Sequence, residues 1–181
     1  MAELSPEDFE YSHELHELAV NMRGEFLQGS TWTEMLISDI LALYFCPQFN
    51  RRSLFFSEIA YGMRFVSKVE LLQKVISRDF PNFKESHPGF VRRLDKFRVF
   101  RNLLAHGHID TSPEALSSRK PDEVTFVVYK AGEPKRRRVT VDEATKQADE
   151  ANELRGQLLE IQRHLFAINQ NQLKSSGGET A

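Results

Sequence analysis

One six-residue stretch carries side chains that could act together on a phosphodiester: Arg101, Asn102 and His106 lie within it, and Gly107 follows at once. The planar guanidinium of arginine suits phosphate oxygens, and histidine can give or take a proton near neutral pH because its ordinary pKa is about 6.5. RNA cleavage by internal transfer needs a base for the ribose 2′-hydroxyl, an acid for the leaving 5′-oxygen and a cation for the phosphate. These residue types match that chemistry, with Asn102 suited to orient the imidazole or bind a phosphate oxygen.

The spacing of the three residues has a consequence if they lie on one helix. Positions four apart on an ideal α-helix differ by about 40° and positions five apart by about 140°. Asn102 and His106 therefore share a face, whereas Arg101 must reach round with its long side chain or meet the His106 of a second chain. Two copies related by a two-fold axis would bring two histidines to one phosphate, which is enough for an acid and a base without a metal.

A purely structural role explains the same residues. A histidine before a helix-ending glycine can cap the last carbonyl groups and interact favourably with the helix dipole. An arginine one turn earlier can simply extend to the surface. On this alternative the stretch does no more than end a helix.

The elements that must position the stretch are predicted to be mainly helical. Capping residues and apolar spacing predict helices over about residues 5–27, 31–46, 53–76 and 88–106, with Ser5 as N-cap of the first and Gly29 at its end. A loop over 108–122, strands at 123–130 and 135–141 with a turn between them, and a long final helix follow. The fold class is thus mainly α: an antiparallel up-and-down bundle of about five helices, with a small β-hairpin before the long C-terminal helix. One domain is expected over 1–172, with the hairpin near 123–141 and a disordered tail at 173–181.

Composition narrows the class of protein. A chain of 181 residues can bury a core without staples, and its single cysteine, Cys46, allows no intramolecular disulfide. The net charge of −2 argues against a general nucleic-acid coat. The acidic N-terminus and the absence of an apolar run near 20 residues favour a cytoplasmic protein. No glycine-rich phosphate loop or Rossmann fingerprint occurs, so an NTPase or a dehydrogenase is not expected.

Further residues are candidates to support the stretch. Glu34, Asp39 and His108 can hold Arg101 or His106 in place by hydrogen bonds. Basic residues are most densely clustered on the predicted hairpin, at Lys130, Lys135, Arg136, Arg137 and Arg138. Together with Arg98, on the predicted helix that carries Arg101 and His106, they can form a track for an RNA backbone. The alternative, which we favour slightly, is a charged edge strand that protects the hairpin from aggregation. His106 and His108 lack nearby ligands at metal spacing apart from Asp110, so no metal and no cofactor is predicted.

The string Arg-Asn-Leu-Leu-Ala-His-Gly, closing a helix with helices before it and a loop and last helix after it, resembles the HEPN superfamily of small helical-bundle proteins. The superfamily signature is an arginine, usually followed by a polar residue, and a histidine after four to six intervening residues; Arg101, Asn102 and His106 match it with four. The resemblance in architecture covers roughly 5–172, and the match of residues is confined to 101–107.

The resemblance implies an antiparallel bundle that dimerises with the two motifs facing each other. Many members are metal-independent endoribonucleases of toxin–antitoxin, phage-defence or RNA-processing systems, and others lack activity and bind nucleotides or partners. One toxin branch carries a tyrosine two residues after the histidine, which a partner antitoxin nucleotidylates; this chain departs from that pattern with His108. The expectation is a homodimeric, metal-independent endoribonuclease acting on RNA, with an antitoxin or regulatory protein as a possible partner. The alternative is a non-catalytic module of the same fold that binds a nucleotide or a protein.

Overall fold

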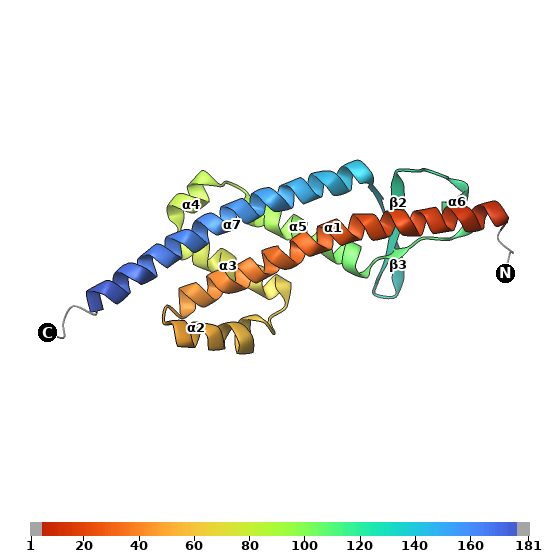
Figure 1. Ribbon diagram of the computed structural model, residues 1–181. Helices are drawn as coiled ribbons and strands as arrows, with labels where there is room; N and C mark the ends of the chain where they lie inside the picture. The colour runs from red at the N-terminus through yellow and green to blue at the C-terminus, as the bar shows by residue number, and fades with distance from the viewer. Residues whose placement is uncertain (1–4, 177–181) are drawn as a thin grey trace. The chain divides into compact units, whose positions relative to one another are not determined.

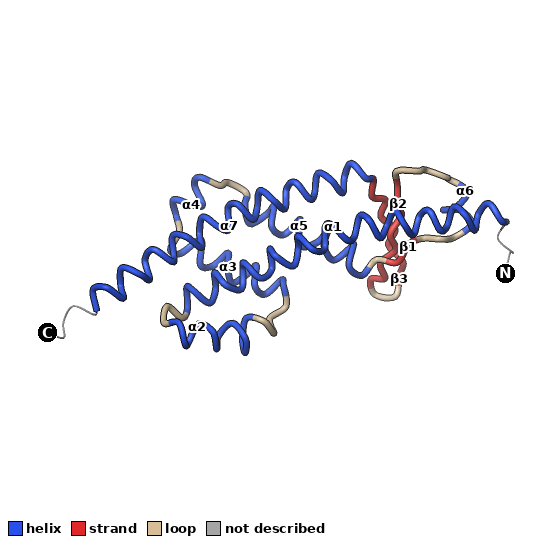
Figure 2. The backbone as a smooth tube through the Cα atoms, viewed as in Figure 1, coloured by secondary structure: helices blue, strands red, loops and turns tan. Residues whose placement is uncertain are grey.

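The computed structural model describes residues 5–176 and is 75% helical (Figure 1). The mainly α class is confirmed, as is a small antiparallel sheet before the long C-terminal helix. The helices in the described residues are α1 (Pro6–Phe45), α2 (Phe49–Phe55), the π-helix η1 (Phe56–Ala60), α3 (Phe65–Asp79), α4 (Pro81–Ser86), α5 (Phe90–His106), α6 (Pro113–Ser117) and α7 (Val141–Ser176). The strands are β1 (His108–Ile109), β2 (Glu123–Lys130) and β3 (Glu133–Thr140), drawn in red in Figure 2.

Contacts divide the chain into two compact units, each of which is described by itself. The first unit comprises Met1–Ser30 and Val99–Glu150, and the second comprises Thr31–Arg98 and Ala151–Ala181. The first unit holds the sheet and the end of α5, and the second holds α2, η1, α3 and α4. Of the tail predicted at 173–181, residues 173–176 continue α7 and residues 177–181 lie outside the described part of the chain.

The start of α1 follows the predicted capping pattern. The Asp8 amide donates to Ser5 Oγ at 3.1 Å, and the Ser5 amide donates to an Asp8 carboxylate oxygen at 3.3 Å. These reciprocal bonds form a capping box in which aspartate takes the place of glutamate. Pro6 occupies the first helical position, where the absence of an N–H costs nothing. The N-cap prediction at Ser5 is therefore confirmed.

The predicted break between the first two helices is wrong, because α1 runs through Gly29 as one helix of 40 residues. Buried positions continue without interruption along it, at steps of three and four residues: Met22, Phe26, Ser30, Thr33 and Ile37. The hydroxyl of Ser30 donates to the Leu27 carbonyl at 2.8 Å, which satisfies it inside the helix. A small polar residue therefore takes the place of an apolar one on the buried face, and the sequence pattern was misread as a helix end.

The helix predicted over 53–76 is also interrupted. It begins within α2, passes through η1, leaves helical geometry around Gly62 and resumes as α3. The residues of this region differ in burial: α2 buries none of its residues and Ile59 of η1 is 52% exposed, whereas Val69 and Leu72 of α3 lie in the core. The apolar spacing across this region therefore does not describe a single buried face.

The predicted hairpin is confirmed, and a third strand, β1, extends it to a three-stranded sheet. β2 pairs with β3 from Glu123 opposite Thr140 to Lys130 opposite Glu133, and β1 pairs with β2 on its other side. Ala131 and Gly132, with φ of 53° and 82°, form the two-residue turn, and positive φ at both positions is typical of a type I′ turn. Thr140 then accepts a hydrogen bond from the Glu143 amide at 3.1 Å and caps the start of α7.

Candidate functional site

Apolar side chains fix the last two turns of α5 in the first unit. Phe100, Leu103 and Leu104 are buried, and the Phe100 ring meets Phe26 of α1 edge to face with 4.9 Å between centroids. Edge-to-face rings add stabilisation beyond the area they bury. The packed face of α5 therefore sets the direction in which the polar residues at 101, 102 and 106 project.

Arg101 and Asn102 lie beside each other, half-buried, next to this apolar face. The Arg101 Nη1 group donates to the Asn102 side-chain oxygen at 3.2 Å. Because a hydrogen bond to a charged donor is stronger than a neutral one, the amide helps to hold the guanidinium in place. The structure thus brings these two predicted site residues into direct contact.

His106 is the last residue of α5, and its side chain is exposed. It follows Asn102 by four residues, so the two share a helix face about 40° apart, whereas Arg101 lies about 140° round the helix. The imidazole is accessible to a solvent-borne ligand or to a second chain. The relation expected between the three residues from helical spacing therefore holds within the continuous helix α5.

Gly107 packs so closely against β2 that no larger residue fits without movement. Its amide donates to the Leu103 carbonyl at 2.8 Å and continues the helical pattern by one residue. A Cβ at this position would lie 2.5 Å from the Leu103 carbonyl oxygen and 3.1 Å from Cβ of Phe126, which is fully buried. The glycine therefore joins the end of α5 to β2 and fixes the place of His106.

Arg23 of α1 is a site residue that the sequence analysis missed. Its Nη2 group donates to the Gly107 carbonyl, and its guanidinium carbon lies 5.1 Å from the centroid of the Phe126 ring. A cation at the C-terminal end of a helix is favoured by the helix dipole. A signal was present in the sequence, because Arg23 follows Ala19 by four residues and precedes Phe26 by three, and both of these are buried.

The basic residues of β3 are paired with carboxylates. β3 contacts only β2 within the sheet and is therefore an edge strand. Four of its cations make ion pairs, at 3.0, 2.6, 2.6 and 3.7 Å: Lys135 with Glu133, Arg136 with Asp110, Arg137 with Glu143 and Arg138 with Glu123. Lys130, at the end of β2, is exposed. This pairing favours the charged edge strand over an RNA track along β3.

Asp110 is the buried member of this set, at 8% exposure. Burial acts to raise the pKa of its carboxyl group, but hydrogen bonds from Arg136 and Ser112 outweigh burial, so the pKa lies below its ordinary value. The carboxylate is held 2.6 Å from Nε of Arg136. Asp110 thus ties the segment after β1 to the edge strand.

The predicted supporting residues fall in different places. His108 lies in β1 of the first unit, exposed, with its ring 6.5 Å from that of Tyr129. Glu34 and Asp39 belong to the second unit, as does Arg98, which pairs with Asp95 at 2.7 Å.

Both acidic residues have partners inside the second unit. Glu34 accepts from Nζ of Lys68 at 2.8 Å, and the Lys68 side chain is only 4% exposed. Asp39 accepts from the Gln162 side-chain amide at 2.6 Å. Each carboxylate therefore has a structural role in its own unit.

Among the described residues, no group of three or more His, Cys, Asp or Glu side chains is arranged to hold a metal ion. Likewise, no helix within the described range is both long enough and apolar enough to cross a membrane. Comparison with family models, with curated proteins and with solved structures gave no match.

Proposed function

We propose that this protein is a metal-independent endoribonuclease that acts as a homodimer, as its resemblance to the HEPN superfamily implies. The observation that supports the proposal is the arrangement at the end of α5. An arginine is held by Asn102 through a 3.2 Å hydrogen bond, and an exposed histidine follows one turn later at a fixed helix end. A structural cap alone does not require an arginine and an asparagine paired beside it.

Each residue has a defined role in the proposed reaction. A histidine takes the proton of the ribose 2′-hydroxyl as O2′ attacks phosphorus, and the bond to the 5′-oxygen breaks. The leaving oxygen receives a proton from a second histidine, and the products are a 2′,3′-cyclic phosphate and a 5′-hydroxyl. Arg101 stabilises the negative charge that builds on the phosphate oxygens, and Asn102 positions Arg101.

Two chains complete the proposed site. One His106 cannot act as acid and base in the same step, and Arg101 lies about 140° round the helix from it. A second copy, related by a two-fold axis and facing the first, supplies another histidine and another arginine to the same phosphate. Each chain on this account carries half of the site.

A cleavage assay tests the proposal. Purified protein is incubated with single-stranded RNA in EDTA, and the product ends are analysed. Cleavage that leaves 2′,3′-cyclic phosphate and is lost in His106→Ala supports the proposal, provided that folding and dimerisation persist. His13→Ala is the matched control, because His13 is also an exposed helical histidine, with a side-chain exposure of 75%.

Other outcomes of these experiments would support the two alternatives, a non-catalytic binding module or a structural helix cap. Wild-type protein that cuts no RNA yet binds a nucleotide or a protein through the α5 end is a non-catalytic module of the same fold. A His106→Ala variant that only loses thermal stability identifies the histidine as a helix cap. A strict monomer in light scattering removes the geometry on which the two-histidine mechanism depends.

A further inference from the structure

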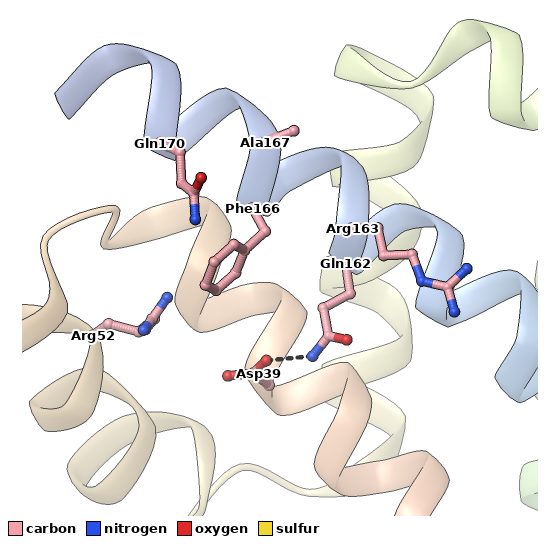
Figure 3. A pocket seen from close by; sticks show the side chains of 7 residues that line it. All are labelled: Asp39, Arg52, Gln162, Arg163, Phe166, Ala167 and Gln170. Carbon is pink, nitrogen blue, oxygen red and sulfur yellow. Dashed lines mark hydrogen bonds between the residues drawn. The ribbon is translucent and has the colours of Figure 1, made fainter. Parts of the chain in front are cut away.

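A second site lies in a cavity of the second unit, lined by side chains from α1, α2 and α7. Its volume is about 450 Å³, within the range of small-molecule sites. The residues that line it are Asp39, Arg52, Gln162, Arg163, Phe166, Ala167 and Gln170 (Figure 3). A carboxylate, a guanidinium and an aromatic ring thus border the same space.

The wall formed by α1 and α7 offers hydrogen-bond acceptors. One carboxylate oxygen of Asp39 accepts from the Gln162 amide at 2.6 Å, which fixes the orientation of both side chains. Figure 3 shows the second carboxylate oxygen pointing toward the side of the cavity where Arg52 lies. The half-buried Asp39 therefore presents a fixed acceptor to a ligand that carries N–H groups.

The opposite wall offers a hydrogen-bond donor, the guanidinium of Arg52. The guanidinium carbon of Arg52 lies 5.2 Å from the centroid of the Phe49 ring and 5.8 Å from that of Phe166. These cation–π contacts hold the side chain without using its N–H groups. Within residues 5–171, Arg52 forms no ion pair, and in Figure 3 it points toward Phe166. Its donors are available to a ligand.

We propose that this cavity binds a guanine base. Guanine carries two adjacent donors, N1–H and the N2 amino group, which suit the Asp39 carboxylate. It also carries the acceptors O6 and N7, which arginine recognises with two parallel hydrogen bonds. Phe166 borders the cavity and is 46% exposed, so its ring provides a surface on which the base can stack.

Adenine fits the same groups poorly. Its N1 is an acceptor and would face the Asp39 carboxylate, and its 6-amino group would face the Arg52 guanidinium. The first contact would place an acceptor against an acceptor, and the second would place a donor against a donor. The inference concerns binding alone and does not depend on whether the protein cleaves RNA.

Calorimetric titration of the full chain with guanosine, inosine and adenosine tests the proposal. Guanosine should bind, inosine should bind about tenfold more weakly because it lacks the N2 amino group, and adenosine should bind more weakly still. A second arm compares 5′-GMP with a uridine-rich oligonucleotide that contains one guanine. Tighter binding of the oligonucleotide identifies RNA as the source of the base, and tighter binding of 5′-GMP identifies a free nucleotide.

Variants assign the binding to this cavity. Asp39→Asn and Phe166→Leu should each weaken guanosine binding about tenfold, since they remove the carboxylate or the stacking surface. Arg51→Gln is the control: Arg51 is exposed on α2 and does not line the cavity, so affinity should stay within about twofold.

The melting temperature of each variant shows whether it has folded. If Asp39→Asn does not fold, Phe166→Leu carries the test, because Phe166 is 46% exposed and contributes little to the core. Equal affinity for guanosine and adenosine, no binding of guanosine, or full affinity in Phe166→Leu overturns the proposal.

Discussion

Replacing Gly107 with alanine should destabilise the protein, whereas the same replacement at Gly29 should stabilise it. At Gly107 the added methyl group would meet the Leu103 carbonyl oxygen at 2.5 Å and Phe126 at 3.1 Å. At Gly29, inside α1, it would meet nothing within 4 Å. The two substitutions add the same atoms, so the difference between them reports the surroundings of each site.

The magnitudes follow from packing and chain entropy. Overpacking costs about 1–3 kcal/mol, and the upper half of this range, about 2–3 kcal/mol, applies here because a Cβ contact of 2.5 Å is shorter than any ordinary one. The loss of glycine's freedom in the unfolded chain returns about 0.4–1 kcal/mol, which leaves a net cost of about 1–2.5 kcal/mol for Gly107→Ala. Gly29→Ala gains about 0.5–1 kcal/mol, because glycine is a poor residue in a helix interior. For a chain of this length each kcal/mol shifts the melting temperature by about 2–4 °C.

Thermal melts of the two variants and the wild type measure the effect. Gly107→Ala should melt about 2–10 °C lower and Gly29→Ala about 1–4 °C higher than the wild type. A rise in Gly107→Ala would refute the close contact between the end of α5 and β2. A fall in Gly29→Ala would mean that the glycine ends a helix, as the sequence pattern first indicated.

Three further substitutions test the contacts around the site. Arg23→Met should cost about 1–3 kcal/mol in chemical denaturation, because the Gly107 carbonyl loses a charged donor, and an unchanged midpoint would contradict that role. Asp110→Asn should cost about 1–2 kcal/mol at neutral pH, since the ion pair with Arg136 is partly exposed. The folded pKa of Asp110 is lowered from 3.8, so this stabilisation is present above pH 3.8 and is lost as the pH falls through the folded pKa. The difference in the free energy of unfolding between wild type and Asp110→Asn should therefore become smaller below about pH 4. A difference that stays constant with pH would exclude the ion pair as the source of the lost stability. Ser5→Ala should cost about 1 kcal/mol through loss of the α1 cap, measured by the same denaturation, and no change would show that the cap is dispensable.

Local signals in the sequence predicted the ends of several elements. Ser5 was predicted as a helix cap and accepts the expected amide hydrogen bond, and Thr140 accepts the corresponding bond at the start of α7. The short helix α6 carries the same signal, because Ser112-Pro113-Glu114 repeats the pattern of Ser5-Pro6-Glu7. Ser112 accepts from the Ala115 amide at 3.4 Å, so α6 was predictable from the pattern that identified α1.

The predictions from the sequence were wrong where burial, rather than local preference, decides the conformation. Gly29 was predicted to end the first helix, but Ser30, which follows it, is buried at 3% exposure and continues the inner face of α1. The predicted third helix shows the converse case, because Ile59 has the right spacing and yet faces solvent. Periodicity identifies an apolar stripe but does not show whether another element covers it.

At the candidate site, the sequence predicted the residues of the motif but not the contacts that these residues make. The pairing of Arg101 with Asn102 joins adjacent residues, although helical spacing grouped Asn102 with His106. The contact between Arg23 and Gly107 spans 84 positions, and only the folded chain brings the two together. The residues of the motif were therefore predictable. The position of Arg23 on the buried face of α1 was a signal in the sequence, but its contact with Gly107 was not predictable.

The chemistry at the 3′ ends of RNA fragments tests the central proposal most directly. RNA is incubated in EDTA with wild-type protein, with His106→Ala and with His13→Ala, and the fragment ends are identified by mass spectrometry. We expect 2′,3′-cyclic phosphate ends with wild type and His13→Ala, and intact RNA with His106→Ala. Intact RNA with wild-type protein across the pH range in which histidine titrates, or equal cleavage by His106→Ala, would contradict it.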